Sequence, residues 1–104
     1  MNRISNPSEV KGLMAQKKNF FITKNSIKGS FYRFIEKEEL KSWKDIVEKI
    51  GGGCKYFEAL NFEGFSIYVD ENGRGNMQEK NDIASIIAGF PVFGNAFVIF
   101  NQSC

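Results

Sequence analysis

The sequence contains no histidine and only two cysteines among its 104 residues. The lack of histidine excludes the imidazole general base, the serine–histidine and cysteine–histidine nucleophile pairs, and most zinc sites. Cys54 and Cys104 lack the spacing of a metal cluster, and we expect no structural disulfide between them in a cytoplasmic chain. We therefore predict a protein that is not an enzyme and has no catalytic residues, no metal site and no cofactor.

Long apolar runs and a signal peptide are also lacking. No apolar run approaches the ~18 residues that a membrane span requires, and the chain opens on the polar stretch MNRISNPSEV. We therefore expect a cytoplasmic location and no membrane partner. With 42% hydrophobic and 25% charged residues, the composition is that of a globular protein, and the length predicts one domain over residues 1–104.

Acidic residues are almost absent from the N-terminal third. Residues 1–33 contain seven basic residues and one acidic residue, whereas residues 34–104 contain seven basic and eleven acidic residues. Such a split is typical of a surface that binds an anionic partner. The alternative is a set of solvated lysines on an exposed hairpin, where lysine also protects edge strands from aggregation.

Residues 38–50 form the clearest helical pattern. Their apolar residues recur at spacings of three and four, which places them on one stripe of a helix. These residues are Leu40, Trp43, Ile46, Val47 and Ile50. Gly51 can adopt the left-handed conformation that ends a helix. We therefore predict one amphipathic helix over 38–50, with Trp43 as a core anchor; the alternative is a binding-site aromatic.

Shorter elements are predicted on both sides of this helix. Residues 7–17 begin with the signals of a helix start, because Asn6 suits the N-cap and Pro7 the first position. Residues 82–88 predict a third, short helix. Runs of aromatic and β-branched residues predict a hairpin over 20–23 and 27–36.

Three further strands are predicted at 54–60, 65–70 and 96–100. Residues 97–100 show no polar alternation, which is typical of a central strand covered on both faces. The fold class we predict is α+β, with a mainly antiparallel sheet of about five strands. A basic N-terminal helix and hairpin (1–37) would precede a core of helix and sheet (38–104).

The order of turn and glycine motifs in residues 40–100 is distinctive. The motifs are Ile50-Gly51-Gly52, Asp70-Glu71-Asn72-Gly73, and Gly94-Asn95 before the last apolar strand. This order resembles a family of small proteins of unknown function encoded by phages, plasmids and other mobile elements. The resemblance implies an accessory gene, among which inhibitors of host defence are common. We therefore expect a non-enzymatic protein in the host cytoplasm that binds and inhibits a host factor, such as a CRISPR nuclease.

The candidate binding surface is the basic hairpin, where cationic and aromatic side chains alternate. The candidate binding residues are Lys17, Lys18, Lys24, Lys28, Tyr32 and Arg33. The expected partner is a host protein, namely a defence effector. The chain would block it sterically, through the basic N-terminal region or through an exposed β edge. The alternative partner is nucleic acid or a nucleotide signal, because cations neutralise phosphate and aromatic rings stack on bases. The pattern is also compatible with a homodimer.

Other patterns favour structural over chemical interpretations. Residues 51–53 are three glycines after a helix, whereas a phosphate loop leads from a strand into a helix, so we interpret them as a helix stop. Cys54 has no identifiable base to activate it. Four carboxylates near one loop lack the alternating ligands of a calcium site. We interpret these four as solvated: Asp70, Glu71, Glu79 and Asp82.

Overall fold

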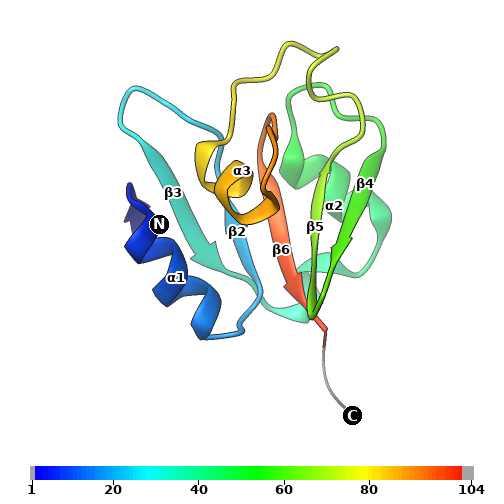
Figure 1. Ribbon diagram of the computed structural model, residues 1–104. Helices are drawn as coiled ribbons and strands as arrows, with labels where there is room; N and C mark the ends of the chain where they lie inside the picture. Colours follow the sequence, from blue (N-terminus) through cyan, green and yellow to red (C-terminus); the bar gives the residue numbers. More distant parts are fainter. Residues whose placement is uncertain (1, 102–104) are drawn as a thin grey trace.

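The computed structural model describes residues 2–101, apart from the side chain of residue 37. Cys104 therefore lies outside the described residues. Along the chain the elements are β1 (Asn2–Ile4), α1 (Pro7–Ala15), β2 (Phe20–Ile22), β3 (Ser30–Phe34), the 3-10 helix η1 (Lys37–Leu40), α2 (Trp43–Ile50), β4 (Phe57–Phe62), β5 (Phe65–Asp70), α3 (Asp82–Ala88) and β6 (Ala96–Phe100) (Figure 1).

The six strands form one antiparallel sheet in the order β1-β3-β2-β6-β5-β4. This arrangement confirms the α+β fold class. The sheet has six strands rather than about five, because β1 pairs with β3 and places Arg3 opposite Phe31. The three residues of β1 are too few to show the alternation from which a strand is predicted.

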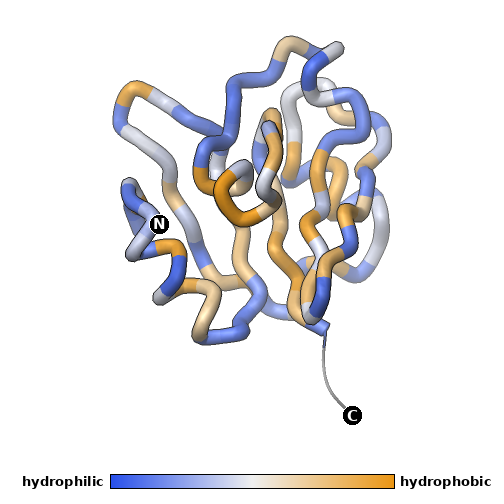
Figure 2. The backbone as a smooth tube through the Cα atoms, in the orientation of Figure 1, coloured by the Kyte–Doolittle hydropathy of each residue, from blue (hydrophilic) through white to orange (hydrophobic). Residues whose placement is uncertain are grey.

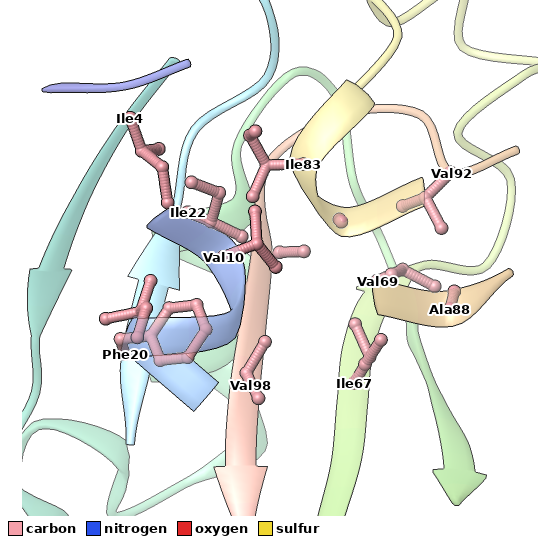
Figure 3. Close-up of a cluster of buried hydrophobic side chains, with 13 residues drawn as sticks. Ile4, Val10, Phe20, Ile22, Ile67, Val69, Ile83, Ala88, Val92 and Val98 are labelled. Atoms are coloured by element: carbon pink, nitrogen blue, oxygen red, sulfur yellow. The ribbon is translucent and has the colours of Figure 1, made fainter. Parts of the chain in front are cut away.

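Helices cover both faces of the sheet. Figure 1 shows α1 and α3 on one face and α2 on the other. The larger core lies under α1 and α3, and Figure 3 shows it as a continuous cluster that includes Phe20, Ile22, Ile67, Val69, Ile83 and Val98. A second core under α2 contains Phe21, Ile35, Ile46, Ile50 and Phe97.

β6 lies between β2 and β5 and belongs to both cores. Val98 packs under α1 and α3, and the neighbouring Phe97 packs under α2; neither is accessible to solvent. The prediction of a central strand covered on both faces is therefore confirmed. Figure 2 shows apolar stretches along the middle of the sheet, while the connections at its ends are mostly hydrophilic. No helix among residues 2–101 is long and apolar enough to cross a membrane.

Two helix predictions are confirmed by their caps. The Oδ1 atom of Asn6 accepts a hydrogen bond from the N–H of Glu9 at 3.0 Å, and α1 then ends at Ala15, two residues before the expected end. Asn81 caps α3 in the same way, and its buried Nδ2 donates to the carbonyl of Ile22 at 3.2 Å. Asn81 thereby fastens α3 to the end of β2.

The prediction of one continuous helix over 38–50 is wrong in its first half. η1 ends at Leu40, and a new helix, α2, starts at Trp43. Ser42 is the N-cap of α2, because its Oγ accepts from the N–H of Asp45 while the Asp45 carboxylate accepts from the N–H of Ser42. This capping box breaks the helix before Trp43. The break leaves Trp43 54% exposed, so its assignment as a core anchor is also wrong.

Candidate functional site

The six candidate binding residues do not form one cluster. They are Lys17, Lys18, Lys24, Lys28, Tyr32 and Arg33. The first two precede β2, and the next two follow it, so these pairs lie at opposite ends of that strand (Figure 1). The last two are neighbours on β3 and therefore point to opposite faces of the sheet.

Tyr32 and Arg33 make contacts within the protein. Tyr32 packs against the core under α1 and α3. Arg33 Nη1 donates to Oε1 of Glu39 at 2.7 Å, and its guanidinium lies 5.9 Å from the centre of the Phe21 ring. A hydrogen bond from the backbone of Glu36, followed by the Arg33 contact, lowers the pKa of the Glu39 carboxyl. Arg33 thus has its charge balanced by a neighbouring carboxylate.

Lys17 and Lys18 line an open groove of about 1230 Å³ at one end of the sheet. The ammonium group of Lys18 lies 5.5 Å from the centre of the Phe34 ring. Acidic residues also line this groove, namely Glu36, Glu38 and Glu63. Because both signs of charge are present, the groove lacks the uniform potential that would attract an anionic partner.

The loop at the other end of β2, residues 23–29, is closed by its own hydrogen bonds. The N–H of Ser26 donates to the carbonyl of Gly29 at 3.2 Å, and the N–H of Gly29 donates to the carbonyl of Ser26 at 3.0 Å. Ser26 Oγ adds a bond of 2.7 Å to the same Gly29 carbonyl. Gly29 has a φ of 103°, a backbone conformation that residues other than glycine rarely adopt.

Asn25 ties this loop to the start of α3. Its N–H donates to the carbonyl of Lys80 at 2.8 Å, and its side-chain amide exchanges two bonds with Asp82, at 2.8 and 3.0 Å. The N–H of Lys24 donates to Oδ1 of Asn95 at 2.9 Å. The loop backbone is thus held in place before any partner arrives, which reduces the entropy lost on binding.

A basic and apolar surface surrounds this loop. Ile27 is fully exposed and precedes Lys28, and the side chain of Arg3 packs so closely on Gly29 that an added Cβ there would come within 3.1 Å of Arg3 Nε. Phe31 is half-buried beside Arg3 in the β1–β3 register. We call this set the basic loop surface: Arg3, Lys24, Ile27, Lys28 and Phe31.

Sequence reasoning found the lysines of the basic loop surface but missed Arg3 and Ile27 as members. Arg3 joins it only because β1 pairs with β3, and that pairing has no local signal in three residues. Ile27 was expected inside a strand, whereas the strand begins three residues later, at Ser30. The signal available in the sequence was an isoleucine next to Asn25-Ser26 and close to Gly29, residue types that favour a turn.

Cys54 is not an activated nucleophile. Burial, with the carboxylate of Asp70 adding to the effect, raises the pKa of the Cys54 thiol to about 11. The thiol is therefore protonated at neutral pH, and its Sγ donates to the carbonyl of Tyr56 at 3.3 Å. Cys54 thus has a structural role within the connection between α2 and β4, residues 51–56.

Asp70 is buried, which corrects the expectation that this carboxylate is solvated. Its Oδ1 accepts from the N–H of Asn72 at 2.9 Å, and its Oδ2 accepts from the side-chain amides of Asn76 at 2.8 Å and Gln78 at 2.6 Å. Both oxygens are thus satisfied by the loop that follows β5. Within residues 2–101 no group of three His, Cys, Asp or Glu side chains is arranged to hold a metal ion.

The geometry thus separates a basic loop surface from a mixed-charge groove and from a loop built around Asp70. Comparisons of the chain with protein-family models, with curated proteins and with solved structures give no match.

Proposed function

We propose that this chain is a non-enzymatic accessory protein of a phage or mobile element that binds and inhibits a host factor. The target we propose is a defence effector such as a CRISPR nuclease, and the contact is made by the basic loop surface. The motif resemblance in residues 40–100 supports the genomic setting. The geometry of the basic loop surface supports the binding role.

The observation that carries the binding role is the full exposure of Ile27 on a loop that is otherwise held by hydrogen bonds. Protein interfaces combine an apolar centre with a polar rim. Ile27 would supply the apolar centre, and the basic residues of the same loop would supply part of the rim. Lys24, Lys28 and Arg3 contribute positive charge around the loop, and the carboxylate of Asp82, bonded to Asn25 at 2.8 Å, adds one negative charge beside it. The matching surface is an apolar pocket bordered by carboxylates on the partner protein.

The proposed mechanism is occlusion without turnover. Positive charge on the rim speeds association with an acidic surface, whereas the apolar contact at Ile27 sets the lifetime of the complex. A loop fixed by Asn25 and Asn95 can insert without first being ordered. Such a protein blocks its target for as long as it stays bound.

A restriction assay tests this proposal. The chain is expressed in bacteria that carry a defined CRISPR nuclease and a matching guide, and plaque formation by the targeted phage is counted. We expect the wild-type chain to restore plaques and the Lys24→Glu/Lys28→Glu variant to lose at least about tenfold of that protection, because reversed rim charges repel an acidic surface.

The matched control is Lys17→Glu/Lys18→Glu, which makes the same change of charge at the other end of β2. We expect this control to protect like the wild type. If the wild-type chain restores plaques against none of the defence systems tested, the inhibitor role is overturned. Equal loss in both double variants would overturn the role of the basic loop surface.

A second candidate function is binding of single-stranded nucleic acid or a nucleotide. The observation that favours it is the pairing of Arg3 with Phe31, which sets a cation beside an aromatic ring on one face of the sheet. Such a pair can hold a phosphate and stack on a base. Binding of a labelled oligonucleotide that weakens steeply with salt, and that Phe31→Ala reduces, would support this candidate over the first.

A further inference from the structure

The outer edge of β4 is open. β4 is the last strand of the sheet and spans six residues, Phe57–Phe62, without lysine or proline; its one charged residue is Glu58. The opposite edge strand, β1, has only three residues. Long edge strands without such protecting residues are templates for pairing with another strand. The open edge is independent of the basic loop surface, which lies on the other half of the sheet.

The backbone groups that face outward can be identified from the hairpin of β4 and β5. Phe62 pairs with Phe65 across a two-residue loop, and in such hairpins the hydrogen-bonded pairs alternate along the strands. The bond from Glu71 N–H to the carbonyl of Tyr56, at 3.0 Å, fixes the same alternation at the other end. Even-numbered residues therefore bond to β5. Phe57, Ala59 and Asn61 direct their N–H and C=O groups outward.

We propose that β4 pairs antiparallel with β4 of a second copy of this chain, around a two-fold axis at Ala59. The outward groups of both strands must meet, so only odd-numbered residues can form the hydrogen-bonded pairs. An axis at Ala59 uses all three outward residues of each copy, pairing Phe57 with Asn61 of the second copy. An axis at Glu58 would place that carboxylate opposite its own copy, which is unfavourable.

Charge complementarity favours this register and this occupant. With the axis at Ala59, Lys55, just before β4, comes near Glu63, in the turn between β4 and β5 of the second copy, and the symmetry repeats the pair at the other end of the interface. Both residues are exposed in the single chain. Ala59 and Asn61 are exposed as well and are small, so they leave room for a neighbouring strand.

The same register covers exposed aromatic surface. Tyr56 is 65% exposed and would lie opposite Phe62 of the second copy. Phe62 stacks on Phe90, with ring centres 6.4 Å apart, and Phe90 is itself 45% exposed. Two such aromatic groups, one at each end of the paired strands, would lose contact with water. Cross-strand aromatic pairs stabilise antiparallel sheets beyond their backbone bonds.

Pairing of this kind continues the sheet from one copy into the other. A two-fold axis perpendicular to the sheet keeps both α2 helices on the same side. The two basic loop surfaces then lie at the far ends of the joined sheet, because β1 and β3 are remote from β4 in the strand order. The dimer would therefore present two separate contact surfaces.

Sedimentation velocity of the purified full chain, over micromolar to millimolar concentrations, tests the proposal. We expect a reversible dimer. Lys55→Glu and Glu63→Lys each place like charges opposite one another, and each should weaken the dimer roughly threefold to tenfold. The double variant Lys55→Glu/Glu63→Lys restores opposite charges and should return to the wild-type dissociation constant.

Ala59→Pro removes the N–H group at the axis and should abolish the dimer, while far-UV circular dichroism reports whether the variant is folded. If that variant fails to fold, the charge-swap series decides the outcome. A chain that stays monomeric at all concentrations would overturn the proposal. So would a dimer that the double charge swap fails to rescue, or a β4 edge that pairs only with a strand of another protein.

Discussion

At the scale of single residues, Gln78 is a buried side chain of the loop after β5. Its Nε2 is bonded to the buried Asp70, and its amide lies between the backbones of two glycines. A Cβ added to Gly52 or to Gly94 would come within 2.5 Å of Gln78 Oε1. The hydrogen bond from Gln78 Nε2 to Oδ2 of Asp70, at 2.6 Å, opposes movement of the amide away from an added Cβ. Gln78 therefore joins the end of α2, the loop after β5 and the approach to β6.

We predict that Gly94→Ala lowers the free energy of unfolding by about 2–4 kcal/mol, through backbone strain and this collision together. Gly64→Ala is the matched control. The φ of Gly64 is 86° against 87° for Gly94, but nothing lies within 4 Å of its added Cβ. We expect the control to cost about 1–2 kcal/mol, from backbone strain alone. Urea unfolding measures both, and equal losses would contradict the close packing around Gln78.

At the scale of elements, the capping box of Ser42 decides where α2 begins. It satisfies two backbone groups at the helix start and leaves Trp43 outside the core. A tryptophan in this position is accessible to solutes, so acrylamide should quench its fluorescence efficiently in the folded protein. The exposed indole therefore reports on the start of α2 rather than on the core.

We predict that Ser42→Ala destabilises the protein by about 1 kcal/mol, because an N-cap is lost. The sign of the change separates two structures. In a continuous helix over 38–50, alanine would be the better helix former and would stabilise the protein by about 0.5 kcal/mol. Urea unfolding gives the sign. Ser66→Ala is the control, because Ser66 lies in strand β5 and its hydroxyl donates to the exposed side chain of Asn61 at 2.7 Å.

The sequence pattern predicted the elements whose signals are local. The bounds of α3 and β5 agree with their expected ranges, since a cap and a clean alternation mark them. The pattern failed at α2, because apolar spacing continued through a capping box that interrupts the helix. It also failed at β1, which depends on pairing with the distant β3.

The candidate surface shows the same division between local and long-range signals. Lys24 and Lys28 were predicted from local composition, and the structure sets both of them in one loop. Arg3 could not be predicted as their neighbour, because it reaches Gly29 through the register of β1. Arg33 was predicted as a binding residue, but its ion pair with Glu39 was not predicted. That pair forms because the chain turns after β3 and brings Glu39 of η1 back to Arg33.

At the scale of the whole molecule, β6 joins two halves that are separate in sequence. The N-terminal strands β1, β3 and β2 lie on one side of it, and β5 and β4 lie on the other. Because β6 contributes Val98 to one core and Phe97 to the other, the cores share a strand. We therefore expect both cores to unfold together.

Two isoleucines test this cooperativity. Ile67 is in the core under α1 and α3, Ile50 is in the core under α2, and both are inaccessible to solvent. We predict that Ile67→Val and Ile50→Val each cost about 0.5–1.5 kcal/mol. Each variant should show one urea transition, with methyl NMR signals from both cores disappearing at the same midpoint. If the methyl signals of one core disappear at a lower urea concentration than those of the other core, the two cores do not unfold as one cooperative unit.

The place of β6 in the chain also bears on how the protein is made. A ribosome synthesises the segment of β6 after the five other strands, yet β2 and β5 each need it as a neighbour. Until residues 96–100 leave the exit tunnel, the nascent polypeptide exposes the facing edges of two unjoined sheets, together with Phe20 and Phe21. Folding of the complete sheet therefore has to wait until β6 is available, and before that the chain is open to chaperones and to aggregation.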